Sequence, residues 1–207
     1  MSLWWKVRRP WLVVCALVGF VLLLLLVKDQ VVNVPSITLL GGAGIKLMNF
    51  LPLIPCAALL FSLERRLGQA EATAVRPVAL LDRGLVLATG AAVLAVGLLL
   101  AATFGMQSSN AAARNVLFLI GVALVARMFF GGLVATAAAA VWLFITVTAG
   151  LKAAHSPYFW AILLEPANRP HAAAATVIAF GAGLLCMNPG PRLRSLRHAL
   201  TNALPRN

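Results

Sequence analysis

"SLERRLGQAEATAVRPVALLDRGL" (residues 62–85) places seven charged side chains between two long apolar runs. Burying such charges in hydrocarbon is costly, so this segment is expected to lie outside any membrane that the flanking runs cross. The 207-residue chain is 62% hydrophobic and only 11% charged, which leaves too little polar surface to cover a water-soluble globule. The sequence therefore predicts a membrane protein.

Six apolar runs approach or reach the roughly 17 to 25 residues that a membrane-spanning helix needs. They cover residues 11–27, 45–63, 85–104, 115–130, 133–149 and 171–187. The fourth and fifth runs are short and meet at RMFFGG, where Gly131 and Gly132 favour a tight hairpin over one helix too long for a bilayer. The expected fold class is all-α, a polytopic membrane protein with about six transmembrane helices within residues 11–187.

The distribution of Lys and Arg predicts the orientation, because basic residues near helix ends are retained in the cytoplasm. With the N-terminus inside, twelve of the seventeen basic residues are cytoplasmic: Lys6, Arg8, Arg9, Arg65, Arg66, Arg76, Arg83, Arg127, Arg192, Arg194, Arg197 and Arg206. The outer set is Lys28, Lys46, Arg114, Lys152 and Arg169. Both termini are thus expected in the cytoplasm of a cell-membrane protein. The net charge of +12 is explained by this topology and by attraction to anionic lipid, without nucleic-acid binding.

Three further segments are expected to lie at the membrane surface. Residues 1–10 combine tryptophans with basic residues, which is typical of an interfacial segment, with a cleaved secretory signal as the alternative. Residues 150–170 contain YFWAILL and predict an interfacial or re-entrant helix. The basic tail, residues 188–207, suits anchoring to anionic lipid or a second contact with a partner.

The search for catalytic chemistry gives no candidate residues. The sequence has no phosphate-binding loop, zinc-protease motif or nucleophile elbow, and its three cysteines and three histidines show no metal-ligand spacing. All five acidic residues fall at or beyond the ends of the apolar runs, which disfavours a proton relay through carboxylates. No catalytic, cofactor or metal site is therefore expected.

Helix packing leaves two interpretations open at several small residues and prolines. The pairs Ala88 and Ala92, Ala91 and Ala95, and Ala135 and Ala139 suit close helix contacts or reflect an alanine-rich composition. Pro52 and Pro55 are expected to kink the second helix, beside a pathway or simply around its neighbours.

The charged segment itself favours a short helix on the cytoplasmic surface. Glu64, Arg65 and Arg66 end the second apolar run, LGQAEATA continues with helix-forming residues, and Arg76 precedes Pro77, which disfavours further helix. The alternative is a solvated loop whose arginines only enforce the topology.

Taken together, the interfacial N-terminal segment, the six spans, the charged cytoplasmic segment after the second span and the apolar outer segment resemble the membrane subunit of ABC-2-type exporters. The resemblance covers nearly the whole chain and rests on architecture. It implies that residues 64–83 form a coupling helix that docks into a separate ATP-binding cassette ATPase. It also implies a second permease subunit and a hydrophobic or amphipathic substrate. The residues expected to touch the ATPase are Glu64, Arg65, Arg66, Glu71, Arg76, Asp82 and Arg83.

Two alternatives remain open. A six-helix substrate-capture subunit of an energy-coupling-factor importer has a similar length and would use the outer segment with Trp160 and Glu165 as a lid. A non-transporting membrane accessory subunit would only anchor its partners.

Overall fold

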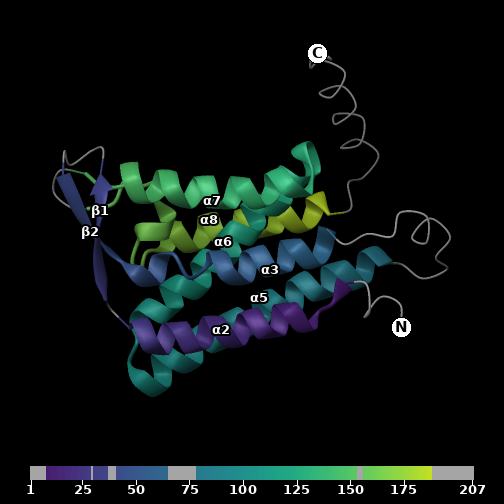
Figure 1. The fold of residues 1–207 in the computed structure, drawn as a ribbon, viewed down its shortest axis with the longest axis horizontal. Helices are drawn as coiled ribbons and strands as arrows, with labels where there is room; N and C mark the ends of the chain where they lie inside the picture. Colours follow the sequence, from purple (N-terminus) through teal and green to yellow (C-terminus); the bar gives the residue numbers. More distant parts are fainter. Residues whose placement is uncertain (1–7, 29, 37–40, 65–77, 153–155, 188–207) are drawn as a thin grey trace, which may run out of the picture.

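The computed structural model describes residues 8–28, 30–36, 41–64, 78–152 and 156–187. The described chain is mostly helical, as predicted (Figure 1). Its elements are α2 (Trp11–Val27), β1 (Val31–Ser36), β2 (Gly41–Lys46), η1 (Leu47–Asn49), α3 (Leu53–Glu64), α5 (Val78–Phe104), α6 (Gln107–Phe130), α7 (Gly132–Ala149), η2 (Ile162–Leu164) and α8 (Pro170–Cys186).

Three helical stretches are long and apolar enough to cross a membrane: Leu47–Glu64, Ala79–Phe104 and Gln107–Phe130. The helices Trp11–Val27, Val134–Ala149 and Pro170–Cys186 are apolar but shorter. α2 has the predicted bounds, and α7 and α8 begin and end within one residue of theirs. The fourth helix is not short, because α6 begins at Gln107 rather than at residue 115.

The helices alternate in direction between two ends of the bundle (Figure 1). We call one the charged end, where Arg8, Leu63, Asp82 and Arg127 meet. The other, the hairpin end, contains β1, β2, residues 150–152 and residues 156–169. α2, α5 and α7 run from the charged end towards the hairpin end, and α3, α6 and α8 run back.

α6 is the central helix and packs against α3, α5, α7 and α8. Its closest approach is to α8, where a Cβ added at Gly121 would lie 2.5 Å from the Ala179 carbonyl oxygen. This contact was not among the small-residue pairs singled out in the sequence. Of those, Ala135 and Ala139 are fully buried, whereas Ala88, Ala91 and Ala95 are exposed.

The outward faces of the helices are apolar. On α2 the exposed side chains include Val14, Val18, Leu22 and Leu26, which recur every four residues and form one stripe. α5, α7 and α8 expose further large apolar side chains, such as Leu98, Phe144 and Val177. A contiguous apolar exterior of this kind is typical of helices that face lipid.

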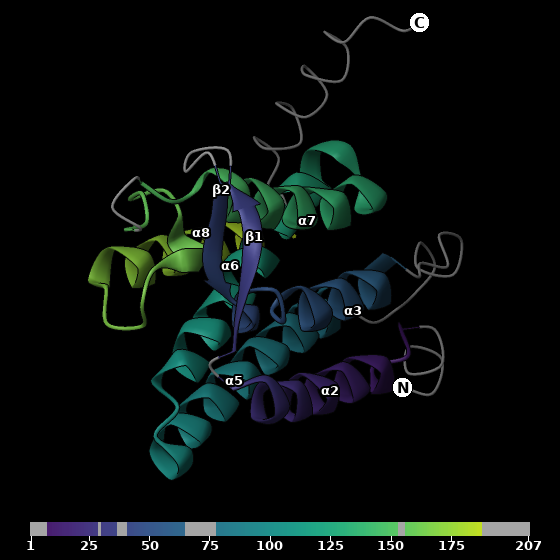
Figure 2. The same cartoon turned by 60° about the vertical axis from the view of Figure 1, so that its left-hand side comes forward.

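A β-hairpin lies between α2 and α3, which the all-α prediction did not include. β1 and β2 pair antiparallel, with Val31 opposite Lys46 and Ser36 opposite Gly41. The Ser36 hydroxyl donates to the Thr148 carbonyl over 3.2 Å. Ala43 and Ile45 pack in one cluster with Val147, near the end of α7, and with Leu151, which follows it. Figure 2, turned to bring this end forward, shows the hairpin crossing the end of the bundle.

The prolines of the second apolar run start a helix and do not kink one. η1 and a turn precede Pro52, and α3 begins at Leu53, so Pro55 occupies its first turn. At this position a helix has no acceptor for the backbone N–H that proline lacks. The run is therefore divided into a short turn and a 12-residue helix.

Candidate functional site

The predicted partner-binding residues lie at both ends of a segment that the structure does not describe. Glu64 is the last residue of α3, and Asp82 and Arg83 lie near the start of α5. The other predicted residues, Arg65, Arg66, Glu71 and Arg76, lie outside the described residues. Because α5 begins at Val78, the part of the predicted coupling helix from 78 to 83 belongs to a long helix that continues to Phe104.

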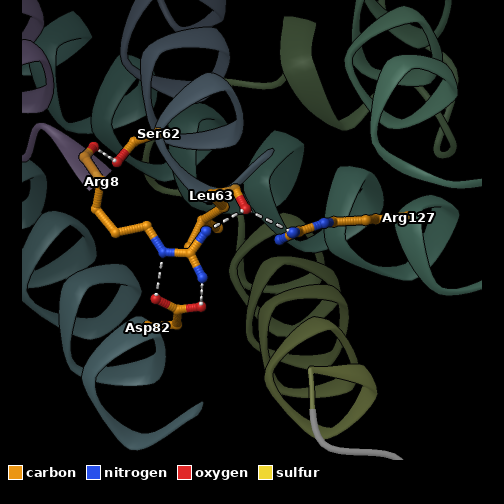
Figure 3. A network of polar contacts seen from close by, with 5 residues as sticks. All are labelled: Arg8, Ser62, Leu63, Asp82 and Arg127. Atoms are coloured by element: carbon orange, nitrogen blue, oxygen red, sulfur yellow. Dashed lines mark hydrogen bonds and ion pairs between the residues drawn. The ribbon is translucent and has the colours of Figure 1, made fainter. Parts of the chain in front are cut away.

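Arg8 joins the two helices that flank this segment (Figure 3). Its Nε donates to Asp82 Oδ1 over 3.0 Å and its Nη2 to Asp82 Oδ2 over 2.6 Å, a bidentate ion pair. Its Nη1 donates to the Leu63 carbonyl over 2.9 Å. The side chains of Arg8 and Asp82 are 1% and 6% exposed. Asp82 thus faces the interior of the chain, and α3 and α5 are joined through one guanidinium.

The Leu63 carbonyl is shared by two arginines. Arg127 Nη2, from the last turn of α6, donates to it over 2.7 Å, and Figure 3 shows Arg8 approaching from the other side. The last carbonyls of a helix have no partner within the helix, so side-chain donors complete them. The Ser62 hydroxyl in turn donates to the Arg8 carbonyl over 2.5 Å. The end of α3 is therefore fixed to the N-terminal segment, to α5 and to α6.

Glu64 packs on the start of α7. A Cβ added at Gly132, the first residue of α7, would lie 2.6 Å from Glu64 Cγ and Cδ, so a larger residue there would require the Glu64 side chain to move. Glu64 Oε1 is buried and has no hydrogen-bond partner among the described residues. An anion at a helix N-terminus is stabilised by the helix dipole. The contact extends the polar cluster of the charged end to α7.

The sequence analysis assigned Asp82 to a contact with a separate ATPase and did not identify its ion pair with Arg8 within the chain. Arg8 was grouped with the interfacial basic residues, yet its side chain is buried. The acid with which it pairs lies 74 positions further along the sequence. A buried ion pair adds little net stability but specifies geometry, because either charge left alone is costly. One signal was available, since Asp82 is the only acid between residues 72 and 164 and a buried acid requires a cation.

A second polar cluster fixes the hairpin end. Arg114, on α6, donates to the carbonyls of Ile162, Glu165 and Pro166 over 2.7 to 2.9 Å. The neighbouring Asn115 donates to the Leu163 carbonyl over 2.8 Å. These bonds satisfy the carbonyls of an irregular chain. In place of the predicted interfacial or re-entrant helix, the described residues form the single turn η2, flanked by turns and irregular chain.

A cavity of about 620 Å³ lies beside this second cluster. Its walls come from β2, η1, the first turns of α6, Leu151, Pro157 and residues 164–168. The apolar side chains in the wall include Ile45, Met48 and Leu164. Its polar wall residues are Lys46, Asn49, Gln107, Ser108, Glu165 and Asn168.

The two ends offer different chemistry. The charged end contains a network of hydrogen bonds that joins the ends of several helices. The hairpin end offers an amphipathic cavity of a volume usual for small-molecule sites, which is about 300–1,000 Å³. Comparisons of this chain with protein-family models, with curated proteins and with solved structures found no match.

Proposed function

We propose that this chain is the permease subunit of an ATP-driven exporter of the ABC-2 type, which moves a hydrophobic or amphipathic substrate and is powered by a separate ATPase. The observation that carries the proposal is the set of hydrogen bonds that Arg8 makes to Asp82 and to the Leu63 carbonyl. It joins the last turn of α3 to the start of α5, the two helix ends between which residues 65–77 are inserted.

The proposed mechanism follows from this connection. A partner that binds residues 65–77 and moves them applies force to the ends of α3 and α5 together, because Arg8 bonds to both. The same force reaches α6 through the bond from Arg127 to the Leu63 carbonyl. ATP binding in the partner would thus reposition three helices, and the substrate path would open between two permease subunits.

The alternating helices and their apolar exterior support six membrane passes with both termini in the cytoplasm. The chain would then lie in the cell membrane, with the charged end inside. Its basic tail, residues 188–207, would bind anionic lipid.

Affinity purification with native neighbours in mild detergent, followed by mass spectrometry and an ATP hydrolysis assay, tests the proposal. We expect a stoichiometric ATPase that is lost when Arg65, Arg66 and Glu71 are all changed to Gln. That triple change lowers the net charge by one, as does the control Lys152→Gln at the opposite end of the bundle. The control should retain the ATPase. Recovery of the chain without an ATPase would refute the proposal.

The cavity favours a second candidate, a substrate-capture subunit of an importer. Glu165, in the expected lid, does line the cavity, and Trp160 stacks on Tyr158 with ring centroids 6.0 Å apart in the same segment. Ligand binding that depends on this segment, together with ATPase association that survives the triple change at residues 65–71, would favour capture over export.

A further inference from the structure

Two arginines at the charged end, Arg9 and Arg83, have no partner within the described part of the chain. Each follows in the sequence one member of the buried ion pair, and neither side chain makes a hydrogen bond or an ion pair with a described residue. Arg9 is exposed. Arg83 is half-buried, and of its guanidinium nitrogens only Nε is fully enclosed. Arg9 and the terminal nitrogens of Arg83 are therefore accessible to an acceptor from outside the chain.

The charge balance at this end favours an anion as that acceptor. The described arginines outnumber the described acids by two, since they are Arg8, Arg9, Arg83 and Arg127 against Glu64 and Asp82. Asp82 is paired with Arg8, and Glu64 packs on the start of α7. No described carboxylate thus remains for the two arginines. A guanidinium binds phosphate or carboxylate most strongly, because it can donate two parallel hydrogen bonds to either group.

The surface around the two arginines is apolar. Leu80 and Leu87 lie one helical turn before and after Arg83 on the same side of α5, and they are 60% and 50% exposed. Trp11, two residues after Arg9, is 54% exposed. Arginine and tryptophan at the end of an apolar helix surface are typical of the boundary between hydrocarbon and lipid headgroups. A docking surface for a water-soluble partner would leave these large apolar side chains in water.

The arrangement of α2 and α5 matches the shape of a phospholipid. Both helices begin at the charged end, run in the same direction and pack against each other (Figures 1 and 2). Their exposed apolar side chains, such as Val14 and Val18 on α2 and Leu87 and Leu94 on α5, continue from the arginines towards the hairpin end. Acyl chains that lie along these side chains would place their headgroups beside the arginines.

The backbone at Arg9 separates two consecutive arginines. Arg9 has a φ of 44°, in the left-handed region that residues with a side chain rarely adopt. At this turn Arg8 is buried, whereas Arg9 is exposed. The conformation that allows Arg8 to join α3 and α5 thus leaves its neighbour at the surface.

We propose that Arg9 and Arg83 bind phosphate groups of anionic phospholipids, whose acyl chains lie along the exposed apolar side chains of α2 and α5. The excess positive charge disfavours a zwitterionic lipid, because the choline group is itself a cation. Arg83, an expected ATPase contact, is assigned to lipid instead. Lipid binding here rests on the membrane placement of the proposed function but needs no ATPase, so either can fail while the other stands.

Quenching of Trp11 fluorescence tests the proposal on the full chain in nanodiscs. The other four tryptophans, Trp4, Trp5, Trp142 and Trp160, are changed to Phe, so that the signal comes from Trp11. Phosphatidylcholine nanodiscs contain a small fraction of phosphatidylglycerol, and one lipid or the other has brominated acyl chains, which quench tryptophan. We expect phosphatidylglycerol to be enriched beside Trp11 by about tenfold or more, since each basic residue near the membrane surface strengthens binding of anionic lipid about fivefold.

Matched variants locate the enrichment. Arg9→Gln and Arg83→Gln should each lower it about fivefold, and the double variant should leave little preference for phosphatidylglycerol. The control Lys28→Gln/Lys152→Gln removes the same charge at the hairpin end and should leave the enrichment beside Trp11 unchanged. The basic tail is present in every variant, so its contribution cancels. The two single variants keep the test decisive where the double variant fails to fold.

Three results would overturn the proposal. One is equal quenching by the two brominated lipids in the otherwise unchanged chain. Another is an enrichment that the double arginine variant retains, or that the control variant loses to the same extent. The third is loss of the copurified ATPase in the double arginine variant while the enrichment persists, which would assign the two arginines to the partner protein.

Discussion

Replacing Asp82 by leucine tests whether the charged end is held by its buried ion pair. The substitution removes the carboxylate that accepts two hydrogen bonds from Arg8, over 3.0 and 2.6 Å. Arg8 is 1% exposed, so its guanidinium stays buried beside an apolar side chain. Its bond to the Leu63 carbonyl compensates only part of the lost interaction.

The expected cost follows from the asymmetry between breaking a buried pair and removing it. Leaving one charge of a buried pair unpaired costs about 3–5 kcal/mol, whereas replacing both partners by apolar residues is often nearly neutral. In Arg8→Met/Asp82→Leu the Leu63 carbonyl keeps its bond from Arg127. The double variant should therefore be more stable than Asp82→Leu alone, by about 2 kcal/mol or more.

The free energy of unfolding is measured by titrating the purified protein with dodecyl sulfate in mixed micelles and following helical circular dichroism. Arg169→Leu is the control, because Arg169 is 61% exposed and its contact with Glu165 is 3.7 Å long. An exposed pair of this kind contributes at most about 1 kcal/mol.

Two results would contradict the reasoning. One is a cost for Asp82→Leu no larger than that of the control, which would mean that solvent screens the pair. The other is a double variant whose cost is the sum of the two single costs, which would mean that Arg8 and Asp82 are not coupled.

Three further predictions concern packing, the hairpin end and topology. Gly121→Ala should lower the thermal midpoint sharply, because a Cβ there meets backbone of α8, whereas Gly181→Ala has open space and should be neutral or slightly stabilising. Asn115→Leu should accelerate hydrogen exchange of residues 156–166, since it leaves a buried loop carbonyl without its donor, while exchange at the charged end stays unchanged. In a background without the native cysteines, an impermeant maleimide should label Ser156→Cys in intact cells and Arg9→Cys only after lysis; the reverse pattern would invert the proposed orientation.

Local sequence patterns predicted the helices well where each helix is apolar along its whole length. α2 is the clearest case, since its predicted and observed bounds coincide. The start of α6 was missed because Gln107, Ser108 and Arg114 lower its hydropathy. Arg114 is nevertheless compatible with a buried position on α6, because carbonyls in and around η2 accept the hydrogen bonds of its guanidinium.

The hairpin and the two polar clusters depend on contacts between distant residues, which periodicity does not encode. β1 contains Pro35, and β2 is rich in glycine, so both carry weak strand signals. Arg8 and Asp82 are separated in the sequence by two helices. The isolated acid indicates that a cation is needed, but it does not identify which one. The predicted role of residues 65–77 stays a prediction, as they lie outside the described residues.

The four hydrogen bonds that Arg114 and Asn115 donate to residues 162–166 all end on backbone carbonyls. Every amino acid carries a carbonyl, so substitutions in this segment leave its anchor intact. Leu164, Glu165 and Pro166 also line the cavity. Substitutions at these three positions would therefore change the chemistry of the cavity wall while the loop keeps its backbone anchor. At the hairpin end, the residues that shape the cavity wall are thus separate from the side chains that hold the loop in place.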